Sequence, residues 1–209
     1  MQRRALIMGL ATLMTAPAAL ARPSSIVLSA DQKARLDQAN RYLSGLKAVR
    51  CRFTQSDPQG SISSGTFWLK RPGKARFQYD PPAELLVVSD GYNVMVYDRR
   101  LKTFDQYPLG STPLGLLLAK DVRLDKGVGI SDIADTQRGF AITAQDARKP
   151  KDGSITLDFS DGPMALNGWT IVDAQGQRTQ VALGAMAEEP GLDPRLFVLN
   201  DPRPRTGRP

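Results

Sequence analysis

The chain has 209 residues, of which 28 are lysine or arginine and 21 are aspartate or glutamate, so its formal net charge is +7. It contains no histidine, which excludes a Ser-His-Asp or Cys-His catalytic set and any metal site built on histidine. Its single cysteine, Cys51, excludes an intramolecular disulfide. Because Cys51 alternates with Val49 and Phe53, a small buried side chain is favoured over a reactive thiol.

The first 21 residues, MQRRALIMGLATLMTAPAALA, have the organisation of a secretory signal peptide. Two arginines precede an apolar run from Ala5 to Met14, and mainly small residues follow up to Ala21. The run is shorter than the ~20 apolar residues of a membrane span, which favours export over anchoring. We therefore expect cleavage after Ala21, one folded domain over residues 22–200, and a disordered Arg/Pro-rich tail over 201–209.

One amphipathic helix is predicted over residues 31–46, where apolar side chains recur every three or four positions. After it, the pattern changes to an alternation of apolar and polar residues, which is typical of strands. Short turn sequences separate these strands, among them Ser89-Asp90-Gly91, a strong hairpin signal. The strands are expected near residues 48–56, 62–71, 75–80, 84–89, 93–98 and 102–107.

A second helix is predicted over residues 111–122, where Thr112 can cap the first turn and three leucines form one stripe. Roughly ten or eleven antiparallel strands in series, with two helices, predict a large curled sheet with the helices against one face. The remaining strands are expected near residues 139–145, 154–160, 167–173, 177–184 and 195–200.

Large apolar side chains recur on the predicted strands and can meet the leucine stripe of the second helix. One interpretation is an ordinary packed core. The other is an apolar binding cavity, because a strongly curled sheet encloses more space than its own side chains fill. The candidate cavity residues are Phe53, Phe67, Leu69, Phe77, Tyr79, Leu86, Val88, Met95 and Tyr97 on the strands and Leu114, Leu117 and Leu118 on the helix.

Arg71 follows Phe67 and Leu69 on the same face of a predicted strand and directly precedes Pro72. A guanidinium keeps its proton and is costly to bury without acceptors. At the rim of an apolar cavity, Arg71 could donate hydrogen bonds to main-chain carbonyls of a covering helix or loop. We therefore predict that Arg71 acts as a latch for that cover.

Other function classes have weaker support. Asp98 and Asp105 could face each other as an acid and a base. Most aspartates of the chain, however, lie in turn-like contexts, where aspartate is common because it hydrogen-bonds the nearby backbone. The sequence has no glycine-rich phosphate-binding pattern, and its positive charge is not concentrated in a stripe suited to nucleic acid. We expect no enzyme, no metal site, no cofactor and no nucleic-acid partner. A hydrolase with two converging carboxylates is the enzymatic alternative.

Several short motifs follow one another in a specific order and spacing over residues 31–200. They are F-x-Q at 53–55, Gly65, K-R-P-G at 70–73, the aromatic pair Phe77 and Tyr79, a proline at 81 or 82, V-x-D-G at 88–91, Y-D at 97–98, P-L-x-x-L-L at 113–118, and Asp173 followed by G-Q-x-T at 176–179. Together these motifs resemble the periplasmic outer-membrane lipoprotein carrier family of Gram-negative bacteria, the LolA type.

The resemblance implies an α+β, mainly β fold: an incomplete antiparallel β-barrel whose concave hydrophobic face is covered by helices. It also implies a periplasmic, monomeric carrier whose cavity takes the acyl chains of lipoproteins. Such carriers receive cargo from an inner-membrane ABC transporter and pass it to an outer-membrane receptor. The latch arginine of the family falls on Arg71. Ala75, Met95 and the Arg/Pro tail depart from the family pattern.

A second function is compatible with the same fold. The half-barrel could serve as a periplasmic lipid-binding, regulatory or scaffold module that transports nothing, because a fold does not fix a function.

Overall fold

The computed structural model describes residues 26–202, except residues 113, 121, 125–127, 148–150 and 152 and the side chains of residues 116 and 146. The predicted signal peptide over residues 1–21 lies outside the described residues. The same holds for residues 203–209 of the predicted tail.

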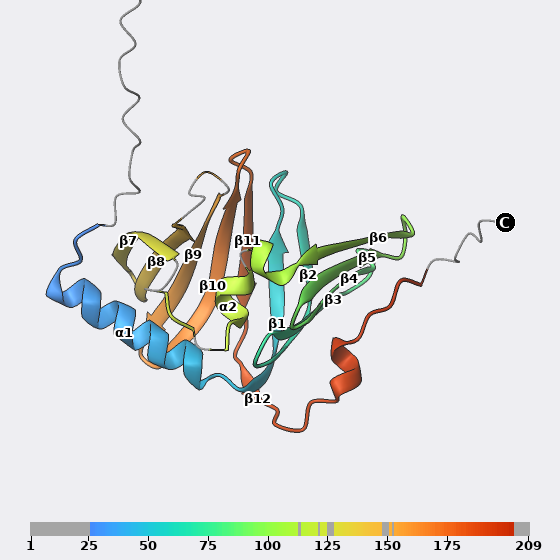
Figure 1. Cartoon of the computed structure of the whole chain (residues 1–209), viewed down its shortest axis with the longest axis horizontal. Helices are drawn as coiled ribbons and strands as arrows, with labels where there is room; N and C mark the ends of the chain where they lie inside the picture. The colour runs from blue at the N-terminus through green and yellow to red at the C-terminus, as the bar shows by residue number, and fades with distance from the viewer. Residues whose placement is uncertain are drawn as a thin grey trace, which may run out of the picture.

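The described strands form one open antiparallel sheet (Figure 1). Its order is β6-β5-β4-β3-β2-β1-β11-β10-β9-β8-β7, and β12 adds a short pairing to β1. Among the described residues β6 and β7 do not pair with each other, so the barrel is not closed. The strands are β1 (Ala48–Ser56), β2 (Ile62–Lys70), β3 (Lys74–Tyr79), β4 (Leu85–Asp90), β5 (Asn93–Asp98), β6 (Thr103–Pro108), β7 (Val128–Thr136), β8 (Gly139–Asp146), β9 (Gly153–Asp161), β10 (Met164–Asp173), β11 (Arg178–Leu183) and β12 (Ala187–Glu188).

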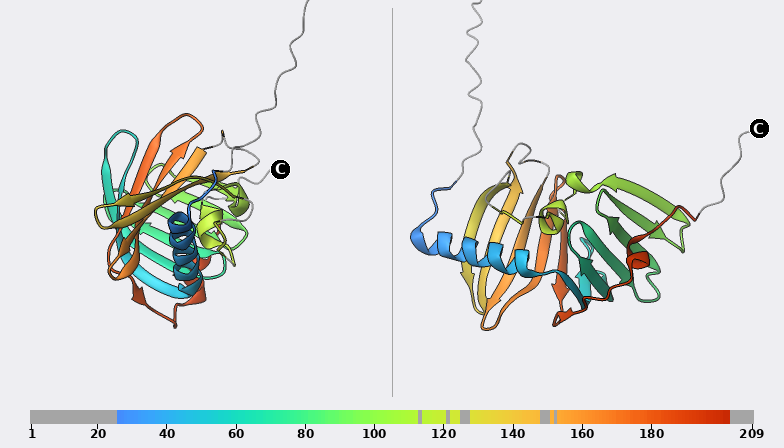
Figure 2. Two further views of the ribbon diagram at one scale, coloured as in Figure 1. Left: turned by 90° about the vertical axis from the view of Figure 1, so that its left-hand side faces the viewer. Right: turned by 60° about the horizontal axis from the view of Figure 1, so that its bottom comes forward.

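The chain builds this sheet outward from its middle. Strands β1 to β6 pair in sequence toward one edge; the chain then crosses to β7 at the other edge and returns by β8, β9 and β10 to β11, beside β1. The crossing segment contains a short 3₁₀ helix, η1 (Leu109–Ser111), and the helix α2 (Leu114–Leu118). This route places the crossing segment over the concave side of the sheet, where Figure 2 shows α2 beside the first helix.

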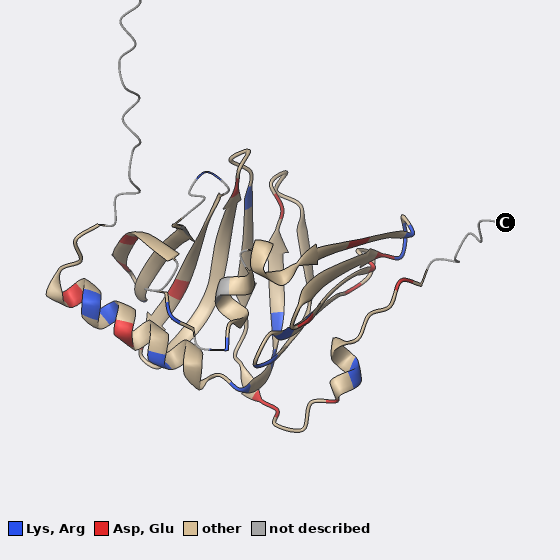
Figure 3. Ribbon diagram, viewed as in Figure 1, with Lys and Arg blue, Asp and Glu red and all other residues tan. Residues whose placement is uncertain are grey.

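The first helix, α1 (Ala30–Gly45), begins at a capping box. The Ser29 hydroxyl accepts from the Gln32 amide, and the Gln32 side chain accepts from the Ser29 amide, so two otherwise unpaired donors are satisfied. Three apolar side chains face the concave side of the sheet and are buried, while charged residues of both signs lie along the rest of the helix (Figure 3). The buried three are Leu36, Ala39 and Leu43.

A C-terminal segment covers part of the opposite, convex face. We call residues 189–202 the strap. Leu192 and Phe197 of the strap pack with Ala48, whereas Leu199 packs against a separate apolar cluster on β4 and β5. Two cations of the sheet donate to strap carbonyls: Lys70 Nζ to Leu192 O and Arg76 Nη1 to Leu196 O, each at 2.9 Å.

The structure confirms the predicted fold class, an open antiparallel sheet with helices on its concave face, but corrects three elements. The predicted strand at 195–200 is wrong: Pro194–Phe197 is a 3₁₀ helix, η3, because Asp193 caps it and Pro194 occupies its first turn. The second helix is shorter than predicted. β7 was not predicted, since a register shift between Ile130 and Asp132 interrupts the alternation that identifies a strand.

Phe197 is the main apolar anchor of the strap, since it is 1% exposed. We expect Phe197→Ala to lower the free energy of unfolding by about 3–5 kcal/mol, because it leaves a cavity between strap and sheet. The neighbouring Val198 is 57% exposed, so Val198→Ala is the matched control and should change stability little. Urea unfolding followed by circular dichroism measures both, and equal effects would contradict this assignment.

Candidate functional site

The concave face carries a continuous group of aromatic rings from both halves of the sheet. Phe53 lies edge-on to Phe77 and Tyr79, with ring centroids 5.4 and 5.0 Å apart. Phe67 lies 4.5 Å from Phe77, and Trp169 of β10 contacts both of these phenylalanines at 6.1 Å. A broad aromatic surface of this kind offers apolar contact area with little conformational entropy to lose.

Gly65 makes room for the central ring of this group. Gly65 of β2 lies directly opposite Phe53 of β1 in the ladder, and a Cβ atom on Gly65 would lie 2.7 Å from Cε1 of Phe53. Real Cβ atoms essentially never approach another atom so closely. The glycine therefore leaves room for the Phe53 ring over the neighbouring strand, where the ring meets Tyr79.

Two helices cover the apolar surface. We call α1, α2 and the described residues that follow α2, from Ala119 to Leu124, the lid. Leu117 and Leu118 of α2 are 2% and 1% exposed and belong to the same core cluster as the aromatic group. The Leu124 amide donates to the Asn40 side-chain oxygen at 3.0 Å, which ties the segment after α2 to α1.

The β2–β3 turn holds the C-terminal end of α2. Arg71 Nη1 donates to Ala119 O, and the Gly73 amide donates to Leu118 O, both at 2.9 Å. The last carbonyls of a helix lack partners within the helix, so these donors act as an external cap. The lid therefore depends at this end on main-chain acceptors and two donors from one turn.

The Arg71 guanidinium is poorly compensated in this position. Its Nε and Nη2 atoms are buried and have no hydrogen-bond partner among the described residues. Burial lowers the pKa of Arg71 to about 10, so the group is still charged at neutral pH. A charge that keeps one hydrogen bond in a dry site is held at an energetic cost, which hydration on lid opening would relieve.

A second turn, between β4 and β5, fixes the position of the β2–β3 turn that carries Arg71. Gly73 has a φ of +75°, and a Cβ atom there would lie 2.6 Å from the Cα of Gly91 in the β4–β5 turn. The Ser89 hydroxyl, which is buried, also donates to Gly73 O at 2.7 Å. The β2–β3 and β4–β5 turns are therefore packed backbone to backbone, and only glycine fits at this contact.

The first helix is held by the other half of the sheet. Arg35 forms ion pairs with Asp161 and Asp135 at 2.7 and 3.4 Å, and its guanidinium lies 4.9 Å above the Phe140 ring. Gln32 Nε2 donates to Ile133 O of β7 at 3.1 Å. The two lid helices are thus held by different strands, and α2 can separate from the β2–β3 turn without breaking these contacts.

Most of the predicted cavity residues lie together on the concave face. Leu114 is half-buried and packs against the same cluster, whereas the other members are buried within it. The buried members are Phe53, Phe67, Leu69, Phe77, Tyr79, Leu117 and Leu118.

Four predicted cavity residues lie on the opposite face: Leu86, Val88, Met95 and Tyr97. Phe77 pairs with Val87 in the ladder, so the odd-numbered residues of β4 share its face and the even-numbered ones face the convex side. Leu86, Val88 and Met95 form the cluster beneath the strap, and Tyr97 pairs with Leu86. The run LLVV is apolar on both faces, so its alternation could not assign the side.

The prediction also missed the half of the site formed by β8, β9 and β10. Trp169 extends the aromatic group, and Phe140 stacks on Phe159 beneath α1, with ring centroids 5.2 Å apart. Period-two alternation in GFAITAQ and SITLDFS identified these strands. No candidate site residue was assigned to them, although alternation alone could have found both phenylalanines.

Two titratable side chains on the concave face are neutral near pH 7. Burial raises the pKa of the Cys51 thiol to about 11. Burial also raises the pKa of Tyr79 to about 12, against the effect of its hydrogen bond to Gln55 Oε1 at 2.7 Å. In the described residues no three His, Cys, Asp or Glu side chains are grouped as metal ligands would be. The arrangement suits the binding of an apolar group.

Comparison with known proteins identifies the family. The family model described as "Outer membrane lipoprotein carrier protein LolA" matches residues 44–200. A protein named outer-membrane lipoprotein carrier protein from Methylibium petroleiphilum is 31% identical over 177 residues, covering 80% of this chain and 85% of the relative. A relative of the same name from Bordetella avium is 31% identical over 181 residues, covering 79% and 83%.

A crystal structure of a LolA superfamily protein from Nitrosomonas europaea aligns with 80% of this chain and 97% of that one, at a TM-score of 0.46 and 9% identity. Within the described part of the chain, every helix is too short or too polar to cross a membrane. The family match spans the curled sheet, the β2–β3 turn and most of the strap. The chain belongs to the LolA family of outer membrane lipoprotein carrier proteins.

Proposed function

We propose that this protein is a periplasmic carrier that binds lipoprotein acyl chains between the concave face of its sheet and its lid. It receives cargo from an inner-membrane ABC transporter, carries it as a monomer and delivers it to an outer-membrane receptor. The names of its relatives and the signal-peptide pattern at its N-terminus support this route. Binding and release require no catalysis.

The observation that carries the proposal is the Arg71 contact at the edge of an apolar surface. The described concave side chains pack against the lid, so an acyl chain must displace the lid to reach them. The lid end near Arg71 is held by the Arg71 and Gly73 hydrogen bonds to main-chain carbonyls. A net hydrogen bond contributes about 0.5–1.5 kcal/mol, or about 1.5–3 kcal/mol when charged, so this end can open reversibly.

An acyl chain that replaces the apolar contacts of the lid is energetically favoured over a lid that opens to water. Each methylene removed from water contributes about 0.8 kcal/mol, so a free multi-acyl anchor is strongly driven into a membrane or an aggregate. An acyl chain that enters beneath the lid replaces the contacts that Leu117 and Leu118 make with the aromatic group. One set of apolar contacts is exchanged for another, so the binding surface is not left open to water.

Arg71 favours release in this scheme. Burying an unpaired donor costs about 1–3 kcal/mol, and Arg71 buries two unpaired nitrogens while it makes one hydrogen bond to the lid. Hydration of the guanidinium therefore offsets part of the cost of opening. The latch fixes the geometry of the closed lid without making closure irreversible.

A scaffold or regulatory module with the same fold is the second candidate. The close packing of the described concave side chains supports it, because a module that binds no lipid requires no room beneath the lid. Direct binding of an acylated ligand distinguishes the two candidates.

We expect Arg71→Leu to slow lid opening about tenfold, because leucine suits the dry site and no longer gains hydration on opening. Cys51 is 5% exposed on the concave face and is the single cysteine, so its labelling rate with a thiol reagent reports opening. Uptake of a triacylated peptide should slow in parallel.

Arg76→Leu is the matched control for this substitution. Arg76 also donates to a main-chain carbonyl and has a buried Nε atom without a partner among the described residues, but it contacts the strap and not the lid. Labelling of Cys51 should therefore stay near the wild-type rate in Arg76→Leu. A wild-type or faster rate in Arg71→Leu would contradict the proposal that hydration of Arg71 favours lid opening.

We expect Leu117→Asp to lower affinity for a fluorescent fatty-acyl probe by about tenfold or more, since a carboxylate beside an acyl chain loses its hydration. Leu101→Asp is the matched control, because Leu101 is 58% exposed in the β5–β6 turn. Equilibrium titration measures both variants after their thermal unfolding has been compared. Equal affinities would exclude α2 from the site and favour the scaffold module.

A further inference from the structure

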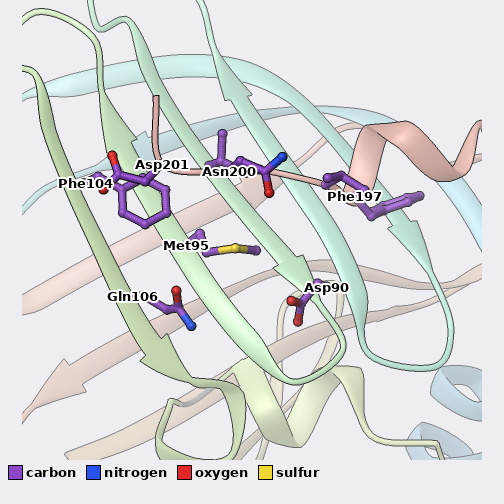
Figure 4. Close-up of a pocket in the computed structure, with 9 residues that line it drawn as sticks. Asp90, Met95, Phe104, Gln106, Phe197, Asn200 and Asp201 are labelled. Carbon is purple, nitrogen blue, oxygen red and sulfur yellow. The ribbon is translucent and has the colours of Figure 1, made fainter. Parts of the chain in front are cut away.

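A hollow lies on the convex face, between the strap and the outer strands. It is an open pocket of about 360 Å³, bounded by β4, β5 and β6 on one side and by the strap on the other (Figure 4). It lies on the far side of the sheet from the lid. Its lining residues are Asp90, Met95, Phe104, Gln106, Phe197, Val198, Leu199, Asn200 and Asp201.

The pocket combines an apolar interior with an acidic rim. Figure 4 shows Met95 at its centre, with Asp90 and Gln106 on one side and Asn200 and Asp201 on the other. Two of the nine lining residues are carboxylates and none is a cation, although the whole chain has a net charge of +7. Oδ1 of Asp90 accepts from the Tyr92 and Asn93 amides at 2.8 Å, which fixes this carboxylate in place.

This chemistry fits a guanidinium on an apolar stem. The methylenes of an arginine can cover Met95 and Phe104, while its planar head donates to a carboxylate at the rim. The aromatic ring adds a favourable face for a cation. Two carboxylates at opposite sides of the pocket suit a segment that carries more than one arginine.

We propose that the pocket binds the C-terminal segment of this same chain, residues 203–209, with the sequence RPRTGRP. The segment begins directly after the strap residues that line the pocket and contains three arginines. Seven residues reach at most about 25 Å, which is ample to fold back over the pocket rim. A tethered segment also has an effective concentration of about millimolar, so weak individual contacts suffice.

Docking of the segment would hold the strap to β5 and β6, where Leu199 already packs against the cluster beneath it. It would also restrain the β4–β5 turn, because Asp90 of the pocket directly precedes Gly91, which contacts Gly73. The Gly73 amide caps α2. The arginines of residues 203–209 would thereby act, through Asp90 and Gly91, on the β2–β3 turn that holds the lid.

The test uses the full chain with Arg203→Gln, Arg205→Gln and Arg208→Gln combined. The Leu196 and Val198 amides form hydrogen bonds within η3, so their hydrogen exchange reports strap docking. We expect exchange to accelerate about three- to tenfold in this variant, and wild-type exchange to approach that rate at high salt. The charge-matched control combines Lys33→Gln, Arg138→Gln and Arg178→Gln, all exposed and on other elements.

A pocket variant identifies the binding surface. Gln106→Lys places a cation in the pocket and should accelerate exchange as the tail variant does, with no further effect when the two are combined. Gln106→Thr keeps the position neutral and should match wild type. Additive effects of Gln106→Lys and the tail variant would overturn the proposal, as would unchanged exchange in the tail variant.

A synthetic RPRTGRP peptide gives the final discrimination. It should bind the tail variant but not the wild-type chain, whose own segment occupies the pocket. Equal binding to both would show that the pocket is open to another basic segment and would overturn the assignment. Absence of binding to the tail variant at millimolar peptide would overturn it as well.

Discussion

The structure depends on how one buried guanidinium is compensated. Arg71 lies at the end of a strand whose preceding inward residues are Phe67 and Leu69, and the acceptor found for it is a carbonyl of the lid. A lysine would present a point charge with a different shape, and an apolar residue would leave Ala119 O without this donor. At this position the cost of burying the guanidinium therefore opposes the hydrogen bond that it makes to the lid.

Both faces of the β1–β6 half of the sheet are apolar, and each has its own cover. The lid covers the concave side, and the strap covers the convex side. Each cover is held through main-chain carbonyls by cations at or near the β2–β3 turn: Arg71 on one side, and Lys70 and Arg76 on the other. Such contacts place no requirement on the identity of the cover's side chains at the accepting positions. Apolar side chains add to both covers: Leu117 and Leu118 in the lid, and Phe197 in the strap.

The sequence predicted the strands, α1 and the open sheet well, because turn residues and alternation are local signals. Alternation with Phe67 and Leu69 put Arg71 on the apolar face, and the cost of burying a guanidinium predicted a main-chain acceptor such as Ala119 O. The error at Leu86, Val88 and Met95 has the same origin as the error at residues 195–200. A strand that is apolar on both faces has no alternation to show which face is inward, and the segment that covers its outer face is itself predicted as a strand over residues 195–200. Contacts between segments more than 100 residues apart leave no such local signal.

The backbone contact between Gly73 and Gly91 fixes the turn that caps α2 without involving the aromatic group on the concave face. Neither glycine touches the aromatic surface, yet both set the height of the turn that caps α2. Substitutions at this contact would change how firmly the β2–β3 turn caps α2, while the aromatic group on the concave face stays the same. Such changes would be invisible to any comparison restricted to the residues of that aromatic group.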